Sequence, residues 1–211
     1  MQNPFTKSII PDQLKNSYYS VVNPFIEMLI RMNANPNVFT FIGLVLGMFS
    51  GYFAARGMML QTTLFLLLSG LCDSIDGTIA RKSNRESRFG ALLDSTLDRY
   101  SEMFVFFGLA YHFIQQQNYI TSLALAIGLG GSLMVSYVRA RSEALGFECK
   151  VGMMQRPERL ILLSIGTLLY KIKFILILII WFIAIMANVT AIHRIFHIYK
   201  QDGGSKNLAA K

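Results

Sequence analysis

Four aspartates stand out in a chain that is otherwise mostly apolar. Asp73 and Asp76 are three residues apart, and Asp94 and Asp98 are four apart, so each pair shares one face of a helix. Each pair lies at the end of a long apolar run, where an ionised group is costly unless something binds it. Four converging carboxylates repel one another, and hard divalent cations such as Mg²⁺ relieve that repulsion. The spacing therefore predicts a site that can hold two metal ions and bridge a diphosphate.

The residues around the aspartates suit an anionic ligand. Gly77 and Ala80 are small and let a ligand approach the helix backbone, and Arg81 can reach a phosphate. Helix packing alone is the simpler explanation of the two small residues. The complete spacing favours ligand contact and reads Asp73-x2-Asp76-Gly77-x2-Ala80-Arg81-x8-Gly90-x3-Asp94-x3-Asp98.

Composition places this motif in a membrane. The chain has 211 residues, 53% of them hydrophobic, and a mean hydropathy of +0.44. Such a composition predicts several membrane spans in one domain. The net charge of +8 is typical of cytoplasmic loops that face anionic lipid, and we expect no nucleic-acid partner.

Hydrophobic patterning predicts an all-α integral membrane fold of six transmembrane helices, preceded by an N-terminal amphipathic helix at the bilayer surface. The expected domains are an amphipathic juxtamembrane segment at 1–36, a transmembrane catalytic domain at 37–197 and a disordered tail at 198–211. Asn37 is the expected N-cap of the first span. The expected spans are 37–55, 60–81, 89–113, 120–144, 157–170 and 174–195.

Two further patterns position these helices. Gly43, Gly47 and Gly51 recur every four residues, which favours close packing inside the bundle over a dimer face. Spans 60–81 and 89–113 are expected to form a hairpin whose facing ends bring the aspartates together. Most lysines and arginines fall on that same side, so both termini and the aspartates should face the cytoplasm from the cell (inner) membrane.

The aspartate spacing resembles the signature of the CDP-alcohol phosphotransferase (CDP-alcohol phosphatidyltransferase) family, and all eight fixed positions match. The resemblance implies that a CDP-linked donor, here CDP-diacylglycerol, passes its phosphoryl-linked half to a hydroxyl and releases CMP. It implies that Asp73, Asp76 and Asp94 bind Mg²⁺ or Mn²⁺. It implies that Asp98 also binds metal and accepts the proton of the attacking hydroxyl. A homodimer is implied as well.

The resemblance extends to the start of the first span. Asn37 and Thr40 match a family segment that lies against the CDP moiety, although helix capping would also explain them. Ser87 matches a position that touches the cytidine diphosphate in some members, and a solvated loop serine is the alternative.

Basic residues could bind the acceptor. Arg139, Arg156 and Arg159 lie near the cytoplasmic ends of two spans and could form an anion pocket, with positive-inside charge as the alternative. A phosphorylated acceptor would explain such a pocket. The run from Leu93 to Arg99, with the later Arg-x-Arg-x-Glu and Glu-Arg segments, looks most like the phosphatidylinositol-phosphate synthase branch, whose acceptor is inositol 1-phosphate.

Other functions stay open at this stage. Glycerol 3-phosphate is a second phosphorylated acceptor used in the family, and inositol is a further alternative. Serine, choline or ethanolamine would need no basic pocket. A cation transport protein is the alternative from another class, because intramembrane aspartates also mark ion pathways. A transporter would place its acids nearer the bilayer centre and would not need Gly77, Ala80 and Arg81.

Overall fold

The computed structural model describes residues 23–172 and 174–209, and all regular structure within them is helical. This confirms the all-α class. A short helix covers 23–31. The others are α2 (Pro36–Ala55), α3 (Met59–Lys82), α4 (Arg88–Gln115), α5 (Tyr119–Ala144), α6 (Arg156–Leu168) and α7 (Ile175–Ala209).

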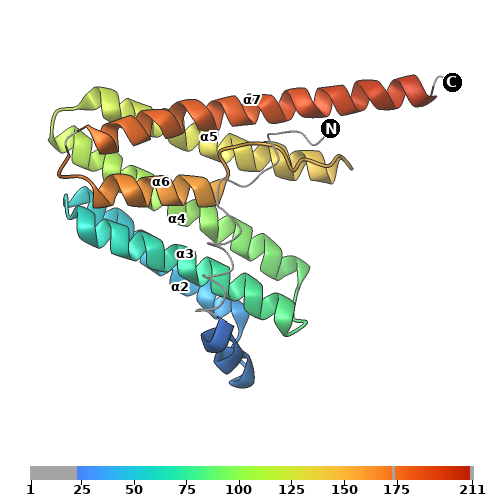
Figure 1. Cartoon of the computed structure of the whole chain (residues 1–211), viewed down its shortest axis with the longest axis horizontal. Helices are drawn as coiled ribbons and strands as arrows, with labels where there is room; N and C mark the ends of the chain where they lie inside the picture. Colours follow the sequence, from blue (N-terminus) through green and yellow to red (C-terminus); the bar gives the residue numbers. More distant parts are fainter. Residues whose placement is uncertain (1–22, 173, 210–211) are drawn as a thin grey trace.

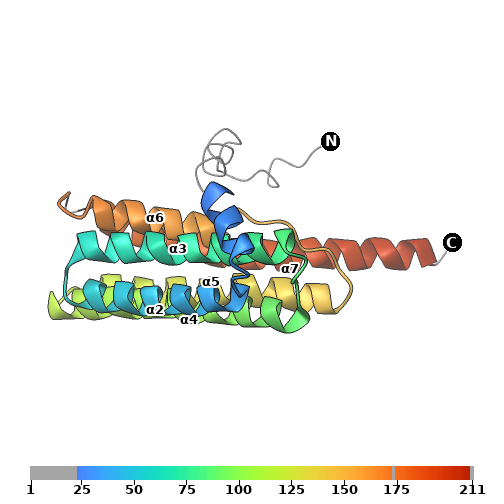
Figure 2. The ribbon, with the colours of Figure 1, turned by 90° about the horizontal axis from the view of Figure 1, so that it is seen from below.

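Helices α2 to α7 run side by side along one axis, and α7 extends beyond the others at one end (Figures 1 and 2). Helix α2 packs against both α3 and α4, α5 packs against α7 and α4, and α6 lies between α3 and α7. The predicted hairpin of α3 and α4 needs a correction, because these two helices touch each other far less than either touches α2. Close packing of α2 on both helices leaves α3 and α4 to converge through their polar ends.

Four helices are long and apolar enough to cross a membrane: α2, α3, α5 and the part of α7 from Ile175 to Gly203. Helix α6 has 13 residues, about 20 Å at the usual rise, which is shorter than a hydrocarbon core of about 30 Å. Helix α4 has 28 residues but carries charged groups such as Asp98, Arg99 and Glu102 along its length. The chain is a membrane protein with these four candidate spans.

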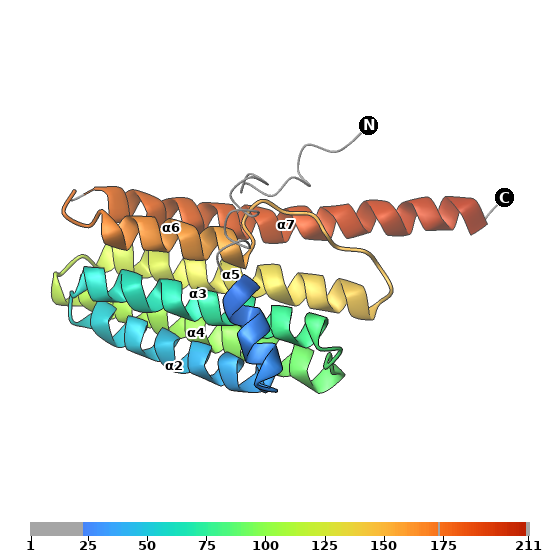
Figure 3. The same cartoon turned by 60° about the horizontal axis from the view of Figure 1, so that its bottom comes forward.

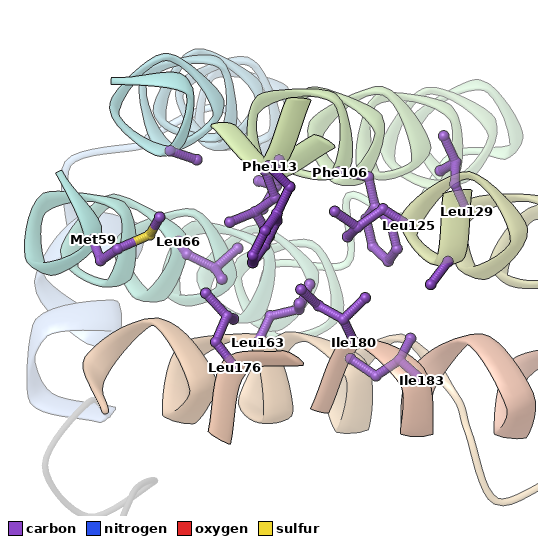
Figure 4. Close-up of a cluster of buried hydrophobic side chains, with 14 residues drawn as sticks. Met59, Leu66, Phe106, Phe113, Leu125, Leu129, Leu163, Leu176, Ile180 and Ile183 are labelled. Carbon is purple, nitrogen blue, oxygen red and sulfur yellow. The ribbon is translucent and has the colours of Figure 1, made fainter. Parts of the chain in front are cut away.

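Figure 4 shows the apolar core, whose residues precede the aspartates on α3 and follow them on α4. It joins the start of α3, the end of α4, the start of α5, and helices α6 and α7. Its buried members include Met59, Leu66, Phe106, Phe113, Leu125, Leu163, Leu176, Ile180 and Ile183. This core fixes how the helices emerge at the opposite, polar end.

The glycines of α2 are packing positions inside the bundle, as predicted. A Cβ on Gly47 would lie 1.9 Å from the Ser101 hydroxyl oxygen, and one on Gly51 would lie 2.3 Å from the Phe104 carbonyl oxygen. Gly108 on α4 returns the contact, since its Cβ would lie 2.0 Å from the Gly51 carbonyl oxygen. The backbones of α2 and α4 are therefore in direct contact.

Two predicted helix ends need correction. The N-cap of α2 is Asn35, whose side chain accepts a hydrogen bond from the Asn37 N–H at 3.1 Å, with Pro36 in the first turn. Helix α7 continues past 195 to Ala209, so the disordered tail expected from 198 is wrong for these residues. Contacts support the extension, because Gln201 bonds His197 one turn earlier and donates to the Glu148 carbonyl oxygen.

The N-terminal amphipathic helix was predicted within residues 1–36, and residues 1–22 of that segment lie outside the described residues. The described part, 23–31, crosses the bundle near the ends of α2 and α3 (Figure 3). Ile26 is buried against Ile75 and Ile79 of α3, whereas Phe25 and Met28 are about half exposed. One face of this helix therefore packs on α3 while apolar groups remain on another.

Substituting Gly51 with alanine is expected to destabilise the bundle by about 1–3 kcal/mol, because the new methyl group meets backbone that cannot turn away. Gly130 is the matched control: it is also helical, and nothing lies within 4 Å of its Cβ position. Gly130→Ala should leave stability unchanged or raise it. Thermal unfolding of both variants in detergent checks this, and equal melting temperatures would contradict the packing of α2 on α4.

Candidate active site

Three of the four aspartates converge in space. Asp73 and Asp76 of α3 and Asp94 of α4 each offer a carboxylate oxygen, and these three atoms lie within 4.8 Å of one another. Asp76 is 3% exposed, although it is ionisable. The predicted spacing thus brings carboxylates from two helices to one point.

The fourth aspartate joins the group through an arginine. Arg156, the first residue of α6, places one guanidinium nitrogen 2.9 Å from Asp73 Oδ2 and the other 2.8 Å from Asp98 Oδ1. Its side chain is 19% exposed, so the pairs are partly shielded from water. The contact links α3, α4 and α6 at the polar end of the bundle, and offsets part of the repulsion among the carboxylates.

The aspartate group fits a divalent cation. Asp76 Oδ2 and Asp94 Oδ1 are buried and have no hydrogen-bond partner in the described part of the chain. Buried carboxylate oxygens without a donor are unfavourable, and a hard cation satisfies them. Oxygen ligands alone, without histidine or thiolate, favour Mg²⁺ or Mn²⁺ over softer metals.

A cavity of about 280 Å³ opens beside the aspartates, between the starts of α2 and α4 and the end of α3. All six predicted donor-binding residues line it, and two of the aspartates do so as well. The lining includes Asn37, Thr40, Asp76, Gly77, Ala80, Arg81, Ser87, Gly90 and Asp94. Residues of the aspartate motif and of the start of α2 therefore line one cavity.

Local structure explains how these side chains are set. Ser87 is the N-cap of α4 and accepts a hydrogen bond from the Gly90 N–H at 2.9 Å. Because Asn35 caps α2, the Asn37 side chain is free to lie beside Gly90. Thr40, one turn later, lies beside the Asp76 carboxylate. The Arg81 side chain folds back over Gly77. A Cβ added to Gly77 would lie 3.3 Å from the Arg81 guanidinium. A capping role and a place in the cavity wall are thus compatible for Ser87.

The three arginines predicted to bind the acceptor have different surroundings. Arg156 reaches the aspartates, as described above. Arg139 is about half exposed and pairs with Glu143, one turn later on α5, at 2.8 Å. Arg159 is 1% exposed and makes a two-point contact with Glu102 of α4 at 2.6 and 2.8 Å, and it also donates to the Met154 carbonyl oxygen. It therefore holds α6 to α4.

Sequence reasoning missed several residues of this end. Arg194 of α7 is 2% exposed and donates to the carbonyl oxygens of Val151 and Val135. Arg85 and Glu86 line the cavity with the predicted residues. The single signal for Arg85 and Glu86 was their place between the two aspartate pairs, and none distinguished Arg194 from other membrane-face arginines.

Replacing Arg156 with glutamine is expected to lower the melting temperature by at least about 2 °C in a metal-free buffer, because the carboxylates lose their paired cation. Millimolar Mg²⁺ should shrink this difference, since a divalent ion supplies the missing charge. Thermal unfolding with EDTA and with Mg²⁺ measures both values, with Arg139→Gln as an exposed control. An equal loss under both conditions would show that Arg156 does not act on the carboxylates.

Replacing Arg159 with methionine is expected to cost about 3–5 kcal/mol of stability, because Glu102 then remains buried without a partner. The double variant Arg159→Met with Glu102→Leu should recover most of that loss. Chemical unfolding of the single and double variants tests this. A stable single variant would mean that the pair does not hold α6 to α4.

Comparisons with known proteins agree with this geometry. Residues 33–199 match the model of the CDP-alcohol phosphatidyltransferase family. The chain is 35% identical over 160 residues to the archaetidylinositol phosphate synthase of Methanothermobacter thermautotrophicus, covering 75% of this chain and 80% of that protein. It is 34% identical over 152 residues to the phosphatidylinositol phosphate synthase of Cutibacterium acnes, covering 71% and 73%.

A solved structure is similar over most of the fold. The crystal structure of Mycobacterium tuberculosis phosphatidylinositol phosphate synthase with CDP-DAG bound has a TM-score of 0.76 and 29% identity, and covers 84% of this chain and 92% of that one. The same enzyme has been solved in complex with manganese and citrate, with a TM-score of 0.77 over 83% of this chain and 88% of that one. The aspartate spacing, the cavity and the match over residues 33–199 together show that this chain belongs to the CDP-alcohol phosphatidyltransferase family.

Proposed function

We propose that this protein transfers a phosphatidyl group from CDP-diacylglycerol to the hydroxyl of inositol 1-phosphate and releases CMP. The observation that carries the proposal is the convergence of Asp73, Asp76 and Asp94 on a cavity walled by small residues and Arg81. A diphosphate needs such a combination: close approach to backbone, a guanidinium, and carboxylates that can hold cations beside it.

Asp73, Asp76, Asp94 and Asp98 are proposed to hold two Mg²⁺ or Mn²⁺ ions. The solved relative in complex with manganese supports a divalent metal in this fold, and the unpartnered oxygens of Asp76 and Asp94 support it in this chain. When bound, the metal offsets the negative charge of the diphosphate and of the departing CMP.

The cytidine diphosphate of the donor is proposed to occupy the cavity, in contact with Asn37, Thr40, Gly77, Ala80, Arg81 and Ser87. Gly77 and Ala80 let the diphosphate approach α3, and Arg81 pairs with a phosphate oxygen. The acyl chains extend from the aspartates toward the bilayer. The relative with CDP-DAG bound supports this donor class.

In the reaction, the acceptor hydroxyl oxygen forms a bond to the phosphatidyl phosphorus, and the bond from that phosphorus to the CMP oxygen breaks. Asp98 is proposed to accept the proton of the hydroxyl, as a carboxylate at the junction of α4 and α6. The Arg156 guanidinium, 2.8 Å from Asp98, holds that carboxylate toward the aspartate group. CMP leaves carrying the electron pair of the broken bond.

The acceptor phosphate is proposed to bind between the start of α6, where Arg156 lies, and the end of α5, where Arg139 lies. Arg159 fixes the first turn of α6 at this site through its pair with Glu102. The relatives support an inositol phosphate, because the phosphatidyl and the archaetidyl enzymes are both named for it and differ in their lipid. The acceptor is thus the shared element among them.

We also propose that α4 and α6 complete a six-helix transmembrane domain, since both pack within the bundle formed by the four apolar helices. Basic residues in the α3–α4 and α5–α6 connections support our proposal that the aspartates and both termini face the cytoplasm from the inner membrane. The helix at 23–31 would then lie at the bilayer surface, and the protein would act as a homodimer.

Purified protein with CDP-diacylglycerol and Mg²⁺ is expected to release CMP with inositol 1-phosphate, and far more slowly with inositol, glycerol 3-phosphate or serine. Asp98→Asn should reduce the rate by about 10²–10⁴-fold, because the proton acceptor is lost. Turnover with another acceptor would keep the family chemistry and refute the inositol phosphate assignment. No CMP with any acceptor, together with a divalent-ion flux that needs Asp98, would favour the transport alternative.

A further inference from the structure

Two helices end in the same kind of turn beside the cavity. Helix 23–31 and α3 are each followed by an asparagine with a positive φ, 60° at Asn33 and 52° at Asn84. The N–H groups of the next residues, Ala34 and Arg85, donate to carbonyl oxygens five residues earlier, at 3.1 and 3.0 Å. This is a common left-handed helix stop, which asparagine adopts more readily than most residues. The ends of the two helices therefore fix where these turns lie.

The Arg85 side chain joins the two turns. Its guanidinium donates to the carbonyl oxygen of Asn33 at 3.3 Å and to the side-chain oxygen of the same residue. A second contact joins the same two helices, in which the Lys82 ammonium group donates to the Asn23 side-chain oxygen at 3.0 Å. Ile26 is 1% exposed and packs on α3. The helix that crosses the end of α3 in Figure 3 is thus attached to it through apolar packing and through polar contacts at both of its ends.

The Arg85 contact runs from one wall of the cavity to another. Asn33 lies three residues before Pro36, where the α2 wall begins, and Arg85 belongs to the wall that the α3–α4 loop forms. Helices α3 and α4 make few contacts with each other, so the loop that joins them gains little support from their packing. Arg85 and Asn33 are both exposed, and exposed contacts add little to folding stability. The consequence of the contact is therefore local, because it fixes the separation of the two walls.

We infer that Arg85 is a positioning residue of the donor site, which ties the α3–α4 loop to the turn before α2 and so holds the two walls at the separation that the donor needs. This rests on the proposed function, which takes the cavity to be the donor site. Because its guanidinium is engaged by Asn33, Arg85 acts through that residue and not by pairing with a phosphate of the donor. Helix 23–31 is the support of this contact, since Ile26 holds the helix on α3.

The test is steady-state CMP release by the purified full chain with CDP-diacylglycerol, inositol 1-phosphate and Mg²⁺. Arg85→Gln and Asn33→Gly each remove the side-chain contact, and glycine keeps the positive φ of the turn. Each should raise the KM for CDP-diacylglycerol about three- to tenfold and leave kcat, the KM for inositol 1-phosphate and the melting temperature unchanged. The double variant should have a donor KM no higher than the higher of the two single variants, because both lose the same contact.

Asn84→Gly is the matched control. It makes the same substitution in the same kind of turn, at a residue that does not line the cavity and whose side chain forms no hydrogen bond with the residues that the structure describes. It should keep the wild-type KM for both substrates.

The outcomes separate the inference from its premise. An unchanged donor KM in Arg85→Gln and Asn33→Gly would overturn the inference and leave the proposed function standing. A raised donor KM in Arg85→Gln alone, or additive effects in the double variant, would also overturn it, since Arg85 would then act on the donor without Asn33. A lower melting temperature together with a lower kcat would show a general loss of structure and refute the specific role. No CMP release by the wild type would refute the proposed function itself, and the inference with it.

Discussion

The crowding of aspartates at the polar end of the bundle is the constraint to which the surrounding structure responds. Carboxylates from α3 and α4 meet within a few ångströms, and one of them, Asp76, is nearly inaccessible to water. The ionised form of such a group is costly unless positive charge lies beside it. Arg156 supplies part of that charge by bridging Asp73 and Asp98. We propose that divalent cations bound at the unpartnered oxygens of Asp76 and Asp94 supply the rest, and that they neutralise the diphosphate of the donor.

The scaffold holds this unfavourable group without closing over it. Helix α2 touches α4 backbone to backbone at Gly51 and Gly108, so it can stand between α3 and α4 and keep their polar ends at a fixed separation. The buried pair of Arg159 and Glu102 fixes α6 to α4, and this places Arg156, three residues earlier, over the aspartates. The cavity then lies in the space that α3 and α4 do not fill against each other.

Local spacing predicted much of this. Asp73, Asp76 and Asp94 come together because each position in the motif is fixed by helix geometry, and the ranges of five predicted spans agree closely with α2 to α6. Contacts between distant segments were not predictable. The pairing of Arg159 with Glu102 depends on how α6 docks, and nothing in the sequence separates a structural arginine from a ligand-binding one. The N-cap of α2 is Asn35 and not Asn37, because Pro36 is the first residue of the helix. Helix α7 continues beyond its apolar stretch, where Gln201 contacts the Glu148 carbonyl oxygen.

The most direct test of this account is a Mn²⁺ titration of the purified protein without substrate. Electron paramagnetic resonance measures how much Mn²⁺ is bound. Wild-type protein should bind Mn²⁺, and Asp94→Asn should weaken that binding by at least about tenfold, because one ligand of the converging group is lost. Glu148→Gln, which removes an acidic group outside the site, should bind as the wild type does. Equal Mn²⁺ affinity in Asp94→Asn and wild type would contradict the claim that these carboxylates form a divalent cation site.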